Sequence, residues 1–287
     1  MPELPEVEIV KQSLEKNVKN KQIKRVVVNN PNLRFKLSKD FSSKIKLSKI
    51  QHVKRFSKYI LLYLHNKSIL VLHLGMSGTV HIIKAGRKNN FTNTSFYSSA
   101  SLPKKHNHIL ISFDKLKIIY NDPRRFGFFR IIENNEKLKQ FFKNYGPEPF
   151  DKKFNIQYLK KSLKNKTKNI KNYLLDQKFV SGIGNIYANE ILYFCKINPF
   201  KQSKSLNKKD YKNIIFYSKK VLKNAIKKGG SSIQNFTNTQ GNKGSFQDNF
   251  KVYQRDKLNC LRKDCNGKIE KKTISNRSVF YCDKCQK

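Results

Sequence analysis

The first eight residues of the chain carry the groups best suited to chemistry. A methionine before a proline is commonly removed, so processing of Met1 would free a secondary amine at Pro2. An α-amino group has a pKa near ~8 and is partly neutral and nucleophilic at pH 7. Such an amine can attack the anomeric carbon of a nucleotide and form an iminium, while a carboxylate such as Glu3 protonates the sugar oxygen. The acidic residues could instead only complement the dipole of the helix that follows, and we favour that interpretation for Glu8.

A second group consists of four cysteines in the last twenty-eight residues. They form the pairs Cys260-x4-Cys265 and Cys282-x2-Cys285, a spacing typical of a zinc ribbon with four thiolates in a closed tetrahedral site. The residues between the pairs predict a hairpin too small to fold on a core of its own. We therefore expect one structural Zn²⁺ ion, with four reduced thiols and no metal as the alternative.

The charge balance predicts a polyanionic partner. The chain has 61 Lys and Arg against 19 Asp and Glu, a formal charge of +42, and Lys and Arg that contact phosphates release condensed counterions from a nucleic acid. A solvated Lys surface without function is the alternative, because Lys, Asn and Ile are abundant together. Arginine is scarce, so Arg124, Arg125 and Arg277 indicate places that need a planar, forked donor.

Elements of two periodicities must position these groups. Val7, Val10, Leu14 and Val18 recur at helical spacing after Pro5, so the terminus leads directly into a helix. Short β-rich runs with turn-like separators then predict an antiparallel sandwich or barrel-like domain. These runs are Ile23 to Asn29, Tyr59 to Leu64, Ser68 to Leu74, Thr79 to Ile83, His108 to Phe113, Leu116 to Asn121 and Phe126 to Ile132.

After about Asn134 the period becomes helical, and the polar stretches Lys84 to Asn107 and Gly229 to Asn249 are expected to be loops. The predicted helices are Glu136 to Tyr145, Asn155 to Leu163, Thr167 to Gln177, Asn185 to Lys196 and Asn207 to Lys228. The most apolar run, Tyr59 to Leu74, is too short and too interrupted to cross a bilayer, and nothing resembles a signal peptide.

Several motifs follow one another in an order that points to a known family. They are Met1-Pro2-Glu3-Leu4-Pro5-Glu6-Val7-Glu8, Arg55-Phe56-Ser57-Lys58-Tyr59, His73-Leu74-Gly75-Met76-Ser77-Gly78, Asp122-Pro123-Arg124-Arg125-Phe126-Gly127, Tyr145-Gly146-Pro147-Glu148-Pro149, Gly182-Ile183-Gly184-Asn185-Ile186-Tyr187 and the cysteine tail. Over nearly its whole length the chain resembles the bacterial formamidopyrimidine-DNA glycosylase family.

The resemblance implies an α+β multidomain fold. Its parts would be an N-terminal antiparallel β-sandwich with a leading helix, a helical domain with a helix-two-turns-helix motif, and a β-hairpin zinc finger. The corresponding division is a catalytic domain at 1–134, a linker at 135–150, the helical domain at 151–249 and the zinc-finger hairpin at 250–287. The stretch Thr237 to Phe246 would close over a flipped base, and Gly241 and Gly244 would make it mobile.

The resemblance also implies catalytic roles. Pro2 corresponds to the Schiff-base nucleophile, and Glu3 to the acid that acts on the deoxyribose ring. Lys58 corresponds to a catalytic or phosphate-holding cation, Glu6 to a carboxylate that organises the terminus, and Arg277 to a residue that grips the DNA strand from the zinc hairpin.

A base must leave the duplex before it can be removed, and something must fill the gap. Family members insert a Met, an Arg and a Phe, which match Met76, Arg124 and Phe126; apolar wedges and one cation suit that task. By composition alone Met76 and Phe126 would be core residues, but their place in the matched turn motifs favours intercalation.

The remaining predicted contacts are with the DNA backbone. Asn185 precedes a helix, where backbone N–H groups and its amide could hold a phosphate. Further backbone contacts are expected from His73, His106, Arg124, Lys166 and Lys168, although each histidine by itself is more often an ordinary surface or structural residue.

The sequence departs from the family pattern at three places. The first cysteine pair encloses four residues where the family usually has two, so its knuckle must be larger. Gln254 replaces a glycine that usually follows the pair corresponding to Val252 and Tyr253. The base-closing loop matches only loosely, and the preferred lesion is therefore the least determined property.

We expect a cytoplasmic, nucleoid-associated monomer that acts on double-stranded DNA containing oxidised bases. It would remove oxidised purines, such as 8-oxoguanine and formamidopyrimidines, and nick the abasic site by β,δ-elimination, with zinc only structural. The alternatives are an endonuclease VIII-type enzyme for oxidised pyrimidines, a non-catalytic damaged-DNA-binding protein, and a general RNA-binding protein. Leu4 and the Arg124-Arg125-Phe126 run favour the purine-specific branch.

Overall fold

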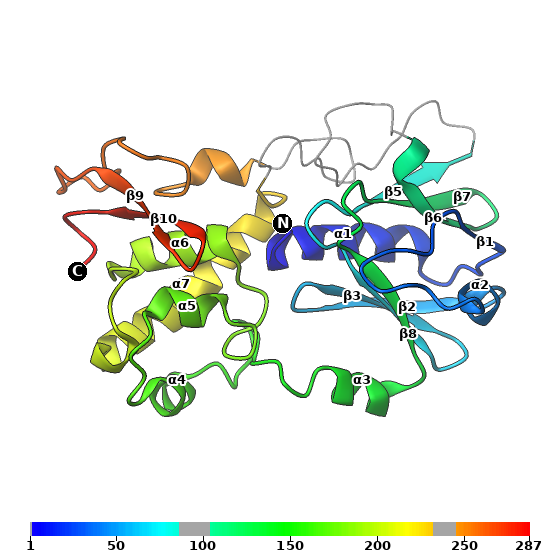
Figure 1. Ribbon diagram of the computed structural model, residues 1–287, viewed down its shortest axis with the longest axis horizontal. Helices are drawn as coiled ribbons and strands as arrows, with labels where there is room; N and C mark the ends of the chain where they lie inside the picture. Colours follow the sequence, from blue (N-terminus) through cyan, green and yellow to red (C-terminus); the bar gives the residue numbers. More distant parts are fainter. Residues whose placement is uncertain (1, 86–103, 232–244) are drawn as a thin grey trace. The chain divides into compact units, whose positions relative to one another are not determined.

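A computed structural model describes residues 2–85, 104–231 and 245–287 (Figure 1). The chain forms two compact units. The first contains Met1–Lys143 and Ile226–Gln247, and the second contains Asn144–Ala225 and Asp248–Lys287. Within the described ranges, no helix is both long and apolar enough to span a membrane.

The first unit is built on two antiparallel four-stranded sheets, with strand orders β1-β6-β7-β5 and β2-β3-β4-β8. The predicted antiparallel sandwich is therefore confirmed. The strands are β1 (Arg25–Val28), β2 (Ile50–Phe56), β3 (Tyr59–Leu64), β4 (Ile69–His73), β5 (Thr79–Lys84), β6 (Asn107–Ser112), β7 (Leu116–Asn121) and β8 (Phe128–Ile132).

The leading helix α1 (Leu4–Val18) packs on β2 and β3. The four residues predicted to form its apolar face, Val7, Val10, Leu14 and Val18, are each at most 2% exposed and lie in the core of the sandwich. Each buried Val or Leu side chain stabilises the fold by roughly 1.5–3 kcal/mol. This burial fixes the helix that begins two residues after Pro2.

Strand β2 is the largest element that the sequence pattern did not predict. Only Ile50 and Val53 are buried among its first five residues, and the register shifts between Ile50 and His52. Because the shift breaks the alternation of apolar and polar residues, no period-2 signal marks this strand. The short helices α2 (Phe41–Ile45) and α3 (Asn135–Phe141) also belong to this unit.

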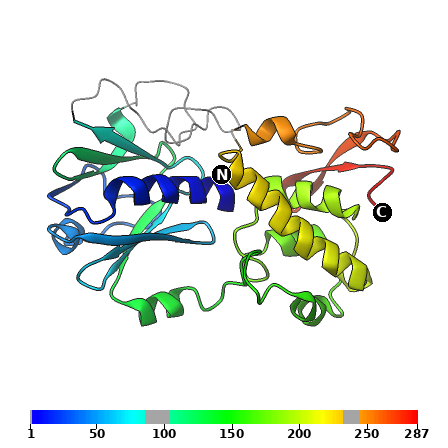
Figure 2. The same cartoon turned by 180° about the vertical axis from the view of Figure 1, so that it is seen from behind.

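The second unit is mainly helical and ends in the predicted hairpin (Figure 2). Its helices are α4 (Ile156–Leu163), α5 (Ile170–Leu175), α6 (Asn185–Cys195) and most of α7 (Lys208–Lys227), and its strands are β9 (Ile269–Ile274) and β10 (Arg277–Cys282). Asn155 and Asn169 cap α4 and α5, each accepting a hydrogen bond from the N–H three residues on. The second cap explains why α5 begins later than expected, at Ile170.

The structure confirms the predicted fold class. The four-part domain division stays a prediction, and most of the predicted base-closing stretch, 237–246, lies outside the described residues. Short 3-10 helices occur at Lys104–His106, Ser203–Ser205 and Phe246–Asn249.

Candidate active site and metal centre

Two glutamates hold the amino terminus. Glu3 is the N-cap of α1 and forms a reciprocal capping box with Glu6, whose Oε2 accepts the Glu3 N–H at 2.9 Å. The other oxygen of Glu6 accepts the backbone N–H and the hydroxyl of Ser231, at 2.8 and 3.0 Å. Pro2, Glu3 and Glu6 are all buried. Three of the predicted site residues therefore lie together at the start of α1.

Lys58 lies in the two-residue turn between β2 and β3, the strands on which α1 packs. It is only 6% exposed, which is unusual for a lysine. Because lysines are rarely this buried, the side chain is a candidate for site chemistry on structural grounds as well. Its positive charge also influences the neighbouring His73.

His73, at the end of β4, is held as a neutral ring. Its Nδ1 accepts the Gly75 N–H at 3.1 Å, and its ring stacks on Phe128 with centroids 5.5 Å apart. Burial, followed by the charges of Lys58 and Arg34, lowers the pKa of His73 to about 4. Because Nδ1 is an acceptor in a neutral imidazole, the proton belongs on Nε2. The ring can therefore donate a hydrogen bond to an anion without being a cation itself.

The three predicted wedge residues lie on two adjacent turns. Met76 is 39% exposed and Phe126 is 42% exposed, so neither is a core residue. The Arg124 guanidinium lies 4.6 Å from the centre of the Phe126 ring, a cation–π contact. Arg124 and Phe126 also line a surface hollow together with Arg34 and Arg125. An exposed Met and Phe beside a guanidinium are suited to insertion between bases.

A buried carboxylate, Asp122, ties the two wedge turns together. It accepts hydrogen bonds from the Ser77 hydroxyl at 2.5 Å, the Tyr120 hydroxyl at 3.0 Å and the Gly127 N–H at 2.8 Å. Gly75, with φ +64°, completes the contact, because a Cβ there would lie 2.4 Å from the Gly127 nitrogen. These contacts fix the two turns that carry Met76, Arg124 and Phe126.

His106 lies beside this network, and its backbone carbonyl accepts the Asp122 N–H at 3.1 Å. Its side chain is half-buried. Burial, with Lys105 and His108 next in effect, lowers the pKa of His106. Its predicted contact with the DNA backbone stays a prediction.

In the second unit the first residue of α6, Asn185, lies next to the hairpin. Its Nδ2 donates to the Ser278 carbonyl at 3.0 Å, and the same carbonyl accepts Lys171 Nζ at 2.9 Å. Ser278 follows Arg277, which is exposed at the start of β10. Asn185, predicted as a phosphate ligand, is therefore hydrogen-bonded to the residue that follows Arg277, the second predicted phosphate ligand.

Arg277 also lines a hollow of about 600 Å³ with Lys166 and Lys168. The turn before it, Ser275 and Asn276, has φ values of +48° and +60°, as in tight two-residue hairpins. This hollow gathers three predicted backbone contacts, and it also contains the acidic Asp176. Three cations in one concave surface can hold a phosphate.

The four tail cysteines converge on one point. Their sulfur atoms all lie within 4.8 Å of one another, with Cys260 and Cys285 at 3.9 Å and Cys265 and Cys282 at 3.6 Å. A tetrahedral zinc site with Zn–S bonds of ~2.3 Å has sulfur–sulfur distances of about 3.8 Å. The donor set therefore fits a tetrahedral metal ion.

The enlarged knuckle between the first two cysteines is fastened to α6. Arg262 Nη2 donates to the Tyr193 carbonyl at 2.5 Å, and its guanidinium lies 4.4 Å from the Tyr193 ring centre. Tyr193 in turn contacts Cys260 through its hydroxyl, 3.6 Å from the sulfur. Gln254, which stands where the family usually has glycine, has φ +58°, a conformation that glycine adopts without strain.

Sequence reasoning missed three buried groups that fix the site. Asp122 was predicted only as part of a motif, with no role of its own. Lys171 and Glu190 were not predicted at all. Lys171 is fully buried, and Glu190 accepts hydrogen bonds from the backbone N–H groups of Lys251, Val252 and Tyr253. Burial raises the pKa of Glu190, and these hydrogen bonds oppose that shift. No spacing signal distinguishes such residues from surface charges, because the partners of Lys171 and Glu190, and the Ser77 partner of Asp122, lie far away in sequence.

Comparisons with known proteins agree with these features. Residues 1–129 match a family model described as Formamidopyrimidine-DNA glycosylase N-terminal domain, and residues 145–237 match Formamidopyrimidine-DNA glycosylase H2TH domain. A formamidopyrimidine-DNA glycosylase of Rickettsia bellii (strain OSU 85-389) is 41% identical over 288 residues, with 100% of both chains covered. One of Wolbachia sp. subsp. Brugia malayi (strain TRS) is 39% identical over 287 residues, again with 100% of both chains covered.

Solved structures from Lactococcus lactis are also similar. A variant of Fpg in complex with a Fapy-dG containing DNA matches with a TM-score of 0.88, 30% sequence identity and 100% coverage of both chains. The wild-type Lactococcus lactis Fpg in complex with an oxidised pyrimidine containing DNA matches with a TM-score of 0.86, 30% identity and the same coverage.

The Asp122 network generates a stability prediction. Asp122→Asn keeps the side-chain shape but turns one acceptor into a donor that faces the Tyr120 hydroxyl and the Gly127 N–H. We expect the free energy of unfolding to fall by about 1–3 kcal/mol in urea denaturation. Asp114→Asn is the control, because Asp114 is 75% exposed in its ion pair with Lys24. Equal losses in the two variants would contradict the structural role of Asp122.

The neutral state of His73 generates a pH prediction. Its pKa of about 4 in the folded chain lies below the ordinary value of 6.5, so the unfolded chain binds more protons between these pH values. The contribution of His73 to the free energy of unfolding is therefore fully present above pH 6.5 and is lost as the pH is lowered towards 4. His73→Gln should flatten this slope by about one proton in urea denaturation at a series of pH values. An unchanged slope would rule out a neutral, buried His73.

Proposed function

The chain belongs to the formamidopyrimidine-DNA glycosylase family, and on that premise we propose that it removes oxidised purines and then cleaves the abasic site. It is a DNA glycosylase that acts in the repair of damaged DNA. The proposed substrates are 8-oxoguanine and formamidopyrimidines in double-stranded DNA. The observation that carries the proposal is the buried capping box of Glu3 and Glu6, which begins at the residue after the buried Pro2.

In the proposed first step, the neutral Pro2 amine attacks C1′ of the damaged nucleotide. The bond from C1′ to the base breaks, and the base leaves with the bonding electron pair and takes up the proton that the Pro2 nitrogen loses. Glu3 protonates the ring oxygen, so the deoxyribose opens and the Pro2 nitrogen becomes an iminium. Glu3 lies next to Pro2 at the buried N-cap of α1, which suits it to this transfer.

The iminium makes the neighbouring C2′ hydrogens acidic, because the nitrogen accepts the electron pair that is left when a proton is removed. Loss of a C2′ proton expels the 3′-phosphate, and a second elimination expels the 5′-phosphate. Hydrolysis of the iminium returns the free amine. We assign the buried ammonium of Lys58 to the stabilisation of anionic groups during these steps.

DNA binding is assigned to surfaces of both units. Met76, Arg124 and Phe126 would fill the gap left by the flipped nucleotide, at a cost of a few kcal/mol in unstacking that new contacts offset. Backbone phosphates would bind His73, His106 and Arg124 in the first unit. In the second unit they would bind Asn185, Arg277, Lys166 and Lys168, and Arg277 acts close to the reacting strand.

We assign a structural Zn²⁺ ion to Cys260, Cys265, Cys282 and Cys285, since their sulfur spacing fits a tetrahedral site. When bound, the ion supplies folding energy to the hairpin and takes no part in the reaction. The hairpin then presents Arg277 on a rigid turn. We further propose that the protein acts as a monomer in the cytoplasm, at the nucleoid, and that the stretch 237–246 closes over the flipped base.

Borohydride trapping tests the nucleophile. Reduction of the iminium should link the Met1-processed chain to a duplex with 8-oxoguanine opposite cytosine. Pro2→Gly replaces the secondary amine with a weaker one and should lower the trapped fraction by about tenfold or more. Absence of an adduct with the processed chain, or an undiminished adduct with Pro2→Gly, would overturn the proposed chemistry.

The same assay compares lesions. A Lactococcus lactis Fpg has been solved in complex with an oxidised pyrimidine containing DNA, so oxidised pyrimidines are a second candidate class of substrate. We expect 8-oxoguanine opposite cytosine to react faster than thymine glycol. The reverse order would assign the chain to the pyrimidine branch and leave the Pro2 mechanism intact.

Zinc removal tests the metal assignment. The purified chain should contain about one zinc ion, and Cys285→Ser should lose it, because three thiolates do not close a structural site. Loss of the ion should unfold the hairpin and weaken duplex binding, measured by metal analysis and fluorescence anisotropy. Cys195→Ala is the control, since Cys195 is buried in α6 and lies outside the cluster. Full metal content in Cys285→Ser would refute the assignment.

A further inference from the structure

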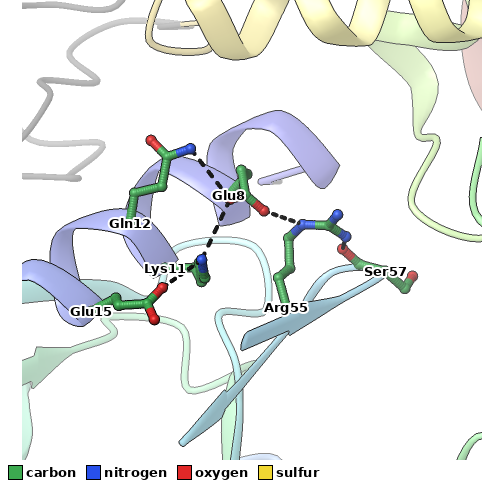
Figure 3. A network of polar contacts seen from close by, with 6 residues as sticks. All are labelled: Glu8, Lys11, Gln12, Glu15, Arg55 and Ser57. Carbon is green, nitrogen blue, oxygen red and sulfur yellow. Dashed lines mark hydrogen bonds and ion pairs between the residues drawn. The ribbon is translucent and has the colours of Figure 1, made fainter. Parts of the chain in front are cut away.

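Arg55 links the helix of the catalytic terminus to the turn of Lys58. Its Nε donates to Glu8 Oε2 on α1 at 2.7 Å, and its Nη1 donates to the Ser57 carbonyl at 2.9 Å (Figure 3). The Arg55 and Glu8 side chains are 9% and 18% exposed. An ion pair with this little solvent contact is screened far less than a surface pair. Glu8 therefore does more than complement the helix dipole, which corrects the interpretation favoured from the sequence.

The turn that Arg55 contacts needs support. Ser57 has φ +53°, a left-handed conformation, and is 1% exposed. Two-residue hairpin turns usually place glycine at such a position, because a side chain is strained in this conformation. A hydrogen bond to the Ser57 carbonyl holds the peptide between Ser57 and Lys58 in this orientation. The orientation of this peptide in turn sets the direction of the Lys58 side chain.

Arginine is suited to this position because one planar guanidinium can donate in two fixed directions. Here one direction meets a carboxylate on α1 and the other meets a carbonyl in the turn. A lysine has a single point charge and cannot keep both contacts in the same geometry. The arrangement couples α1, which begins with Pro2 and Glu3, to the segment that carries Lys58.

We propose that Arg55, oriented by Glu8, is a positioning residue that sets the Lys58 ammonium relative to the Pro2 amine. This inference rests on the proposed function, because it assigns Arg55 and Glu8 to the precision of that reaction. In this proposal neither Arg55 nor Glu8 contacts DNA or the reacting atoms. Their loss should therefore slow the chemical step while duplex binding is retained.

The test compares Glu8→Gln, Arg55→Gln and Arg55→Lys with wild type under single-turnover conditions on 8-oxoguanine opposite cytosine. Displacement of a catalytic group by about 1 Å can cost up to ~100-fold in rate, so we expect each variant to lose at least about tenfold. Affinity for a duplex with a tetrahydrofuran abasic analogue should stay within about threefold. The double variant Glu8→Gln/Arg55→Gln should lose little more than Arg55→Gln alone, because Glu8 acts through Arg55.

Glu15→Gln is the matched control. Glu15 lies on the same helix and makes an ion pair with Lys11 at 2.6 Å, so the variant changes the same charge without touching Arg55 (Figure 3). Its rate should equal that of wild type. Thermal unfolding of every variant separates positioning from loss of fold, and Arg55→Lys and Glu8→Gln decide the question if Arg55→Gln does not fold.

A rescue experiment addresses the turn itself. Glycine adopts positive φ without strain. Ser57→Gly in the Arg55→Gln background should therefore react at least about threefold faster than Arg55→Gln alone. The inference is overturned if Glu8→Gln and Arg55→Lys react as fast as Glu15→Gln, or if rate and affinity fall together. A wild-type chain that excises no base would instead overturn the proposed function, and this inference with it.

Discussion

A nucleophile at the end of a chain can act only if that end is held still, and chain termini are ordinarily frayed. Glu6 imposes this constraint here. Its carboxylate accepts the N–H of Glu3 on one side and both donors of Ser231 on the other, although Ser231 is 225 residues away in the sequence. The first turn of α1 is therefore fixed by a long-range contact, and the burial of the helix on the sandwich fixes the rest. Every assignment of chemistry to Pro2 depends on this anchoring.

Acidic residues are scarce in this chain, and several of them are buried where they collect backbone N–H groups. Glu6 secures the terminus, Asp122 secures the wedge turns, and Glu190 secures the segment before the first cysteine pair. A carboxylate that accepts several hydrogen bonds inside a protein is compensated for the water it loses. The large positive charge of the surface thus coexists with a frame built on a few negative groups.

The scarce arginines are also placed where geometry matters. Arg55 joins Glu8 to the Ser57 carbonyl, Arg124 lies over Phe126, and Arg262 fastens the cysteine knuckle to Tyr193. Each uses the plane or the fork of the guanidinium, which a lysine lacks. Lysines supply most of the charge for attraction to a polyanion, and arginines supply the fixed contacts. This division explains why a chain so rich in lysine keeps arginine at particular positions.

The sequence by itself determined the groups whose meaning is local: the Pro2 and Glu3 terminus, the buried face of α1, the antiparallel sandwich and the cysteine spacing. These follow from residue types a few positions apart, because helical and strand periods and ligand spacing are short-range properties. Only the tertiary structure decided the roles of Asp122, Lys171, Glu190 and the Arg55 link. It also placed the side chains of Met76 and Phe126 at the surface. It also revealed β2, whose pattern a bulge had hidden. The physical reason is the same in each case: a buried charge is defined by partners that the fold, and not the neighbouring sequence, brings to it.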